Sequence, residues 1–252
     1  MPYRVDVTPF AGVLSDGKPH RFAIKVTNNS QYFSTTATLL LYLDHGSEQI
    51  TGAVTQNTIG VPAPAVKPDL VTAADGTVSG TVTTTSSRTL VLAGWVRTSH
   101  GRVKTEIRQQ IDFSNAQQFV SPTSLPQTYV QNITQSTSIS STTRVRGGER
   151  GRESSTRMSW PLEVDLTVNI GADGSFSQVG RIKQAYNRLD SDGDSSSVIS
   201  NSGEWTDTYP TGAGQSGSQR YFSSGDDHCY SRSLTAAGGL LTSILDGKGC
   251  DD

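Results

Sequence analysis

The sequence predicts an all-β protein built from two packed β-sandwich units. Gly, Ser and Thr are abundant and only two Met are present, a composition typical of strands and turns rather than helices. Apolar and polar residues alternate in several segments, most clearly at 103–111 and 162–170, which is the period of a β-strand. Turn signals such as Asp75-Gly76 and Asp173-Gly174 separate these segments.

The first unit is expected to contain most of the strands. Each predicted strand either alternates apolar and polar residues or is almost wholly apolar. These strands comprise residues 4–8, 21–26, 37–43, 51–58, 77–84, 89–96 and 103–111. Pro62, Pro64 and Pro68 predict an extended surface loop at 61–68, because proline cannot donate a hydrogen bond to a strand ladder.

A second unit is expected to follow a break in the pattern. Alternation is lost at 117–127, where Pro122 and Pro126 occur, so we place the boundary between a unit at 1–117 and a unit at 118–252. The predicted strands of the second unit are 129–143, 162–170 and 176–186, the last two forming a hairpin. Residues 234–245 form the single helical candidate, weakened by Gly238-Gly239.

Length, charge and hydropathy restrict the classes of partner. The chain has 252 residues, enough for one large or two small β domains. Its net charge of −2 provides no overall field for nucleic acid, and no apolar run approaches the ~18 residues of a membrane span, so neither partner is expected. No signal peptide is recognisable, and a strand pattern beginning directly after Met1 leads us to expect a chain cut inside its fold.

The two cysteines lie close together near the end of the sequence. Cys229 and Cys250 would close a short loop as a disulfide worth roughly 3 kcal/mol in the chain-entropy model. The alternative is a pair of buried free thiols in a reducing compartment. The Ser- and Thr-rich composition favours a secreted protein or another oxidising compartment, and thus the disulfide.

Four segments together carry a resemblance to a known family. They read YRVDVTPFAGVLSDGKPH at 3–20, TTATLLLYLDHGS at 35–47, AGWVRTSHGRVKT at 93–105 and IDFSNAQ at 111–117. In this order they resemble the latter half of the catalytic region of the peptide N-glycosidase A family, and residues 118–252 look like the C-terminal β domain of that family. The resemblance implies a jelly-roll-like first unit, a glycoamidase activity and no cofactor. It also implies an upstream half of the catalytic region as a partner.

The activity implied by the resemblance is hydrolysis of the amide between asparagine and N-acetylglucosamine in N-glycosylated peptides or proteins. Such a reaction needs a carboxyl group that activates water or protonates the leaving amine. Asp44 is the first candidate because it ends a predicted strand; its alternative role is a turn aspartate that binds backbone two residues on. Glu106 is the second candidate, against a solvated strand glutamate. Asp6 and Asp112 fit strand-edge or turn roles better.

Polar and aromatic residues near these carboxylates are candidates for substrate binding. They are Tyr32, Tyr42, His45 and His100. Tyrosine rings stack on sugar faces, and the histidines alternatively are exposed turn residues. Asp44, His45 and Ser47 are not interpreted as a triad, because adjacent side chains on a strand point to opposite faces.

The remaining polar clusters favour no metal and no nucleic-acid site. Asp190, Asp192 and Asp194 have the spacing of calcium ligands, but Ser195 and Asn201 occupy the positions where an EF-hand loop needs Gly and Glu. The arginine-rich segment 144–157 could contact anions, yet it lacks interleaved aromatic residues and is better explained as an exposed hairpin loop. The rival functions are a non-catalytic carbohydrate-binding module and a purely structural domain.

Overall fold

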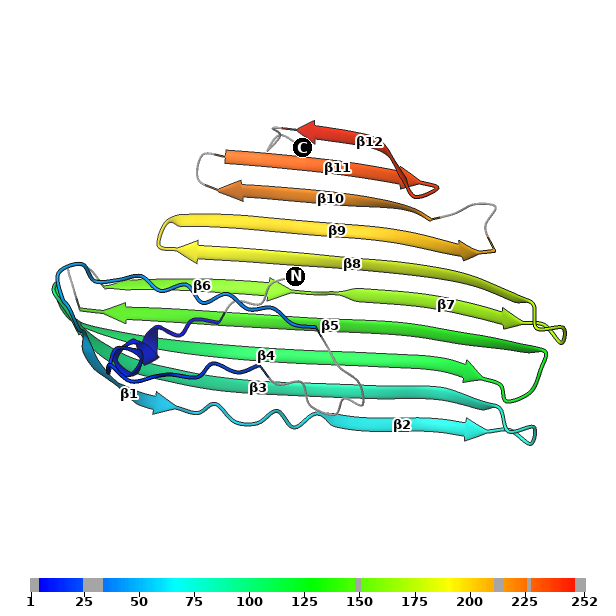
Figure 1. Cartoon of the computed structure of the whole chain (residues 1–252), viewed down its shortest axis with the longest axis horizontal. Helices are drawn as coiled ribbons and strands as arrows, with labels where there is room; N and C mark the ends of the chain where they lie inside the picture. Colours follow the sequence, from blue (N-terminus) through cyan, green and yellow to red (C-terminus); the bar gives the residue numbers. More distant parts are fainter. Residues whose placement is uncertain (1–4, 25–33, 148–150, 211–214, 226–227, 248–252) are drawn as a thin grey trace.

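The computed structural model describes residues 5–24, 34–147, 151–210, 215–225 and 228–247. Its strands form one antiparallel sheet of twelve strands (Figure 1). The strands are β1 (Thr51–Asn57), β2 (Ala65–Thr72), β3 (Val78–Thr98), β4 (Gly101–Ser121), β5 (Gln127–Arg146), β6 (Arg152–Ser159), β7 (Leu162–Ile170), β8 (Phe176–Asp192), β9 (Ser195–Tyr209), β10 (Ser216–Gly225), β11 (His228–Ala237) and β12 (Leu240–Gly247). A 3₁₀ turn, η1 (Thr8–Phe10), and a short helix, α1 (Ala11–Leu14), precede them.

The order across the sheet follows the chain almost throughout. The main path is β1-β3-β4-β5-β6-β8-β9-β10-β11-β12, so most neighbours are joined by tight hairpins. β2 also pairs with β3, and β7 fills the strip between β5 and β8 beyond the end of β6. Figure 1 shows β6 and β7 end to end in this strip.

The alternation of the strands gives the sheet two chemically different faces. Directly paired residues share a face, and Ile133, Val164, Ile182 and Trp205 lie opposite one another on β5, β7, β8 and β9. We call this side the apolar face. The other side carries Ser, Thr and charged residues and is called the polar face.

Much of the apolar face is open among the described residues. Ile182 is 44% and Trp205 is 38% exposed. The chain has an accessible surface of 17522 Å², whereas a compact monomer of its mass of 26.9 kDa would have about 10,800 Å². The sheet is therefore an extended layer, and its buried hydrophobic core is small: Leu92, Val96, Ile107, Met158 and Trp160.

The N-terminal turn and helix cover one end of the apolar face. Glycines allow this close approach: a Cβ on Gly94 would overlap the carbonyl oxygen of Pro9, and a Cβ on Gly12 would overlap the backbone of Gly52. Pro9 and Gly12 are buried as a result. Leu92 and Val96 lie on β3 beneath this end, where the layer is two elements thick.

The prediction of an all-β protein is confirmed. The two sandwich units expected from the sequence are parts of one sheet, and the described residues contain no second sheet packed on its face. β4 runs across the expected boundary at residues 117 and 118, which stays a prediction. The strand predicted at 162–170 coincides with β7, and the alternation at 103–111 is confirmed, since Thr105 and Ile107 are buried while Lys104 is exposed.

Other local predictions are wrong for identifiable reasons. Residues 37–43 alternate like a strand but form none and are exposed, because no neighbouring strand pairs with them. The predicted loop at 61–68 overlaps β2, which tolerates Pro68 because it is an edge strand. The helical candidate 234–245 is the β11–β12 hairpin; Gly238 and Gly239 both have positive φ and form its turn.

The opening segment also differs from its prediction. A strand was expected at 4–8, but the described part of it leads into η1 and α1. Pro9 lies in the first turn of η1, where the missing proline N–H costs nothing. No described helix is long and apolar enough to cross a membrane.

Candidate functional site

The sequence-predicted residues gather mainly at one end of the β3–β4 hairpin. The loop that contains Tyr42, Asp44 and His45 passes this end, and its side chains line a groove of about 780 Å³. Leu14 of α1 and Val96 of β3 contribute the apolar wall of the same groove. Tyr42 is 97% exposed, so its ring is available to a ligand.

Asp44 joins two turns that are distant in sequence. Its Oδ2 accepts a hydrogen bond from the Ser99 backbone N–H at 2.6 Å, and its Oδ1 accepts one from the Ser99 hydroxyl at 2.5 Å. Oδ1 also accepts the Gly46 N–H at 3.1 Å, which is the turn role weighed as the alternative for this residue. Gly46 is needed here because a Cβ at this position would lie 2.5 Å from the Ser99 hydroxyl oxygen.

These hydrogen bonds keep the Asp44 carboxylate charged. The Ser99 hydroxyl and then the Ser99 backbone N–H lower the pKa of Asp44 from 3.8 to about 2, with a smaller contribution from Gly46. The side chain is half-buried and remains in contact with the groove. Asp44 is therefore ionised at neutral pH and cannot serve there as a proton donor.

Ser99 also connects Asp44 to His100. The Ser99 hydroxyl oxygen lies 3.0 Å from Nδ1 of His100. Because the ionised Asp44 has no proton, the single hydroxyl proton of Ser99 is directed to Asp44, and His100 must donate its Nδ1–H to Ser99. In a nucleophilic triad the histidine lies between serine and carboxylate, so this order, with serine in the middle, is different.

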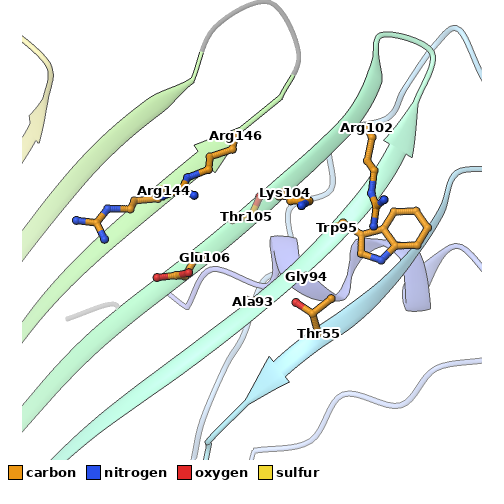
Figure 2. A pocket seen from close by; sticks show the side chains of 10 residues that line it. All are labelled: Thr55, Ala93, Gly94, Trp95, Arg102, Lys104, Thr105, Glu106, Arg144 and Arg146. Carbon is orange, nitrogen blue, oxygen red and sulfur yellow. The ribbon is translucent and has the colours of Figure 1, made fainter.

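Glu106 lies away from this cluster, on the polar face. Val96 pairs with Val103 on the apolar face, and alternation along β4 turns Glu106 to the opposite side. The Arg108 Nε donates to Glu106 at 2.7 Å. Glu106 lines a separate groove of about 300 Å³ (Figure 2). The two candidate carboxylates are therefore not brought together.

The groove beside Glu106 has a strongly basic lining. Arg102, Lys104, Arg144 and Arg146 surround it, with Trp95 and Thr55 at one end (Figure 2). We call it the cationic groove. Trp95 is half-buried and lies under the Arg102 guanidinium, whose central carbon is 4.2 Å from the ring centroid. Trp160, in contrast, is buried and packs against Tyr186.

The remaining candidates have local roles or fall outside the described residues. Asp6 accepts the Thr8 N–H, and Asp112 accepts hydrogen bonds from Ser87 and Gln110, as expected for turn and strand positions. Tyr32 and Cys250 lie outside the described residues, so the Cys229–Cys250 disulfide stays a prediction. Among described residues, no group of three or more His, Cys, Asp or Glu side chains could hold a metal ion.

Two partners of the site could not be found from sequence alone. Ser99 is 55 positions from Asp44, and nothing in its Ser-His-Gly context indicates a carboxylate partner. The cationic groove combines Trp95 of β3 with the first arginines of the 144–157 segment, which adds the aromatic residue that this segment lacks by itself.

Comparison with known proteins supports the family resemblance. The chain is 34% identical over 114 residues to peptide-N4-(N-acetyl-beta-glucosaminyl)asparagine amidase A of Prunus dulcis. This match covers 45% of the chain and 19% of the relative, so the chain spans about a fifth of the relative's length. No family model matches the chain, and no solved structure matches it either.

Proposed function

We propose that this chain is the C-terminal portion of a glycoamidase that hydrolyses the amide between asparagine and N-acetylglucosamine. Its substrates would be N-glycosylated peptides or proteins, and its products an aspartate-containing peptide and a glycosylamine. The similarity to the almond amidase, at 34% identity over 114 residues, is the observation that carries this proposal.

The groove at Asp44 is the proposed substrate-binding region. It offers the exposed Tyr42 ring for stacking on a sugar and His45 for hydrogen bonding, beside an ionised carboxylate. With a pKa of about 2, Asp44 would act as a charged group that orients the substrate amide or a water molecule. It would not protonate the leaving amine.

The proton donor would then come from elsewhere in the complete enzyme. Glu106 faces the other side of the sheet and cannot work on the same amide from its present position. An upstream half of the catalytic region is the proposed partner, and the limited coverage of the relative, 19%, is consistent with a longer protein. The two halves would together surround the glycosylated asparagine.

A specific observation favours a second candidate function, a non-catalytic glycan-binding module. Both oxygens of Asp44 already accept hydrogen bonds from Ser99, and Oδ1 also from Gly46. A carboxylate occupied in this way holds loops together. In that case Tyr42 and His45 would bind a glycan without any bond being cleaved.

Glycan release from a denatured glycopeptide tests the proposal. We expect no release by the chain alone, release by the chain joined to its upstream half, and reduced turnover in Asp44→Asn. Asp173→Asn is the matched control, because Asp173 also accepts a turn N–H, from Ser175, but lies at a distant hairpin. Full turnover in Asp44→Asn would remove this residue from the mechanism, and glycan binding without release in the joined protein would favour the second function.

We also propose an oxidising compartment for the protein, with Cys229 bonded to Cys250. Secreted proteins retain disulfides that cytosolic thiol systems reduce. Intact-mass analysis before and after reduction tests the pairing. A gain of two hydrogens on reduction supports the disulfide, and an unchanged mass contradicts it.

A further inference from the structure

We propose that the cationic groove on the polar face binds a sugar unit that carries an oxyanion: a phosphate, a sulfate or a carboxylate. The site lies on the other side of the sheet from Asp44, and the proposal does not depend on the glycoamidase activity. The lining contains four basic residues and one acidic residue.

The register of the strands separates these charges into two rows. In one row Glu106 lies opposite Arg144, which lies opposite Glu153. These charges are compensated: Arg144 Nε donates to Glu153 at 2.8 Å, and Arg108 Nε donates to Glu106 at 2.7 Å. The carboxylates of this row therefore have cationic partners within the sheet.

The adjoining positions bring like charges together. Lys104 lies directly opposite Arg146, and Arg102 lies directly opposite Arg97. Like charges at directly opposed positions destabilise a sheet. All four side chains are exposed, and none forms an ion pair with a carboxylate of the described residues. An anion placed over Arg102, Lys104 and Arg146 would remove this repulsion.

Trp95 holds the guanidinium of Arg102 in a position in which it can bind an anion. Its ring lies beneath the Arg102 guanidinium at 4.2 Å, and stacking on the face of the guanidinium leaves the N–H groups at its edge available to an oxyanion. Trp95 is also directly opposite Lys104, so the aromatic surface and the two cations are adjacent (Figure 2).

The dimensions of the groove favour a small ligand. Its volume of about 300 Å³ lies at the lower end of small-molecule sites. A monosaccharide unit can place its ring against Trp95 and the Thr55 hydroxyl while its anionic group contacts the cations. A long polyanion such as nucleic acid would extend past these cations over the Arg108–Glu106 and Arg144–Glu153 pairs, whose charges are already compensated, and would gain no further charge pairing there.

The test uses ligands that share one ring: glucose 6-phosphate, glucose 6-sulfate, glucuronic acid and neutral glucose. Binding to the whole chain is measured by calorimetry and by tryptophan fluorescence. We expect at least one anionic sugar to bind and to weaken as salt is raised, glucose to bind at least ~10-fold more weakly, and Trp95→Phe to abolish the fluorescence change. The arms with different anions identify the group preferred.

Arg146→Gln gives two readouts with opposite expectations. It should weaken the anionic sugar at least ~10-fold, yet leave Tm unchanged or higher, because it removes a repulsive neighbour of Lys104. Arg181→Gln is the matched control: Arg181 is a cation on the same face but is paired with Glu204 at 2.8 Å, so its loss should not affect binding. Far-UV circular dichroism checks the fold of each variant.

Several results would overturn the proposal. These are equal binding of glucose and its anionic derivatives, insensitivity to salt in the wild-type chain, equal loss of binding in Arg146→Gln and Arg181→Gln, or a lower Tm in Arg146→Gln. Tighter binding of an oligonucleotide than of every anionic sugar would assign the groove to nucleic acid instead. The salt series on the wild-type chain decides the matter even if a variant fails to fold.

Discussion

The contact between Gly12 of α1 and Gly52 of β1 can be tested by mutation. It holds α1 against the sheet, and α1 forms part of the wall of the Asp44 groove. A Cβ at position 12 would overlap the backbone of Gly52, which cannot rotate away as a side chain could. Gly12→Ala should therefore push α1 off the sheet. Since Ala11 and Leu14 line the groove, the same change should also open it.

The expected magnitude follows from two opposing effects. Overpacking costs about 1–3 kcal/mol, and a backbone overlap belongs in the upper half of this range. Replacing glycine by alanine in a helix returns about 1 kcal/mol. The free energy of unfolding should thus fall by about 1–2 kcal/mol, which lowers the urea midpoint by about 0.5–1 M for a slope of about 2 kcal/mol/M.

Equilibrium urea unfolding followed by circular dichroism measures this change. Gly60→Ala is the control, because a Cβ at Gly60 meets no heavy atom within 4 Å, and its midpoint should move by less than about 0.3 M. If the urea midpoint of Gly12→Ala equals or exceeds that of the wild type, the close contact between Gly12 and Gly52 is not what holds α1 on the sheet.

Three further predictions concern local contacts. The pKa of Asp44 is lower in the folded protein than the usual 3.8, so the Asp44–Ser99 contact should stabilise the loop above about pH 4 and be lost as pH falls toward about 2. The NMR signal of the Ser99 amide should shift over this pH range, and the shift should be absent in Asp44→Asn. Gly203→Val should displace the Trp205 ring, which a Cβ at position 203 would overlap, and shift tryptophan emission, whereas Gly60→Val should not. Arg232→Gln should speed hydrogen exchange in the edge strand β12, because Arg232 binds Asp246 through two hydrogen bonds of 2.6 and 3.0 Å; unchanged exchange would show that the pair is dispensable.

Sequence periodicity predicted the strands whose pairing partners are close in the chain. In residues 162–170 and 103–111, every second side chain lies on the apolar face of the sheet, which explains the alternation. Both segments also pair with a strand that is adjacent in the chain, as part of a hairpin. The same pattern failed at 37–43, where apolar alternation exists without a paired strand. Alternating apolar and polar residues indicate a preference for a half-buried strand. The strand forms only where a neighbouring strand pairs with the segment.

Turn chemistry explains another pair of outcomes. Asp75-Gly76 and Asp173-Gly174 were interpreted correctly, and both glycines have positive φ. Gly238-Gly239 carried an equally strong hairpin signal, but the surrounding leucines also suited a helix, and the turn was missed. Two consecutive glycines at positive φ are compatible with the hairpin and not with a helix interior.

The candidate site was only partly predictable, because Asp44 depends on a partner that is 55 positions away in the sequence. Asp44 was found from its place at the end of a predicted strand, and the structure adds that Ser99 binds both of its oxygens. The turn role and the functional role were treated as alternatives, yet they are compatible. The hydrogen bonds that fix the loop also keep the carboxylate ionised at the edge of the groove.

The role of the arginine-rich segment 144–157 also could not be predicted from its own sequence. Read alone, residues 144–157 mix Arg with Glu and contain no aromatic residue, which argued for a solvated hairpin. Antiparallel pairing then divides the segment: Arg144 meets Glu153 within its own hairpin, while Arg146 meets Lys104 on β4. Arg144 is thus paired with Glu153, whereas Arg146 forms no ion pair among the described residues and lies opposite Lys104, the residue that faces Trp95 on the next strand. Pairing between strands therefore decides which arginine is available to a ligand.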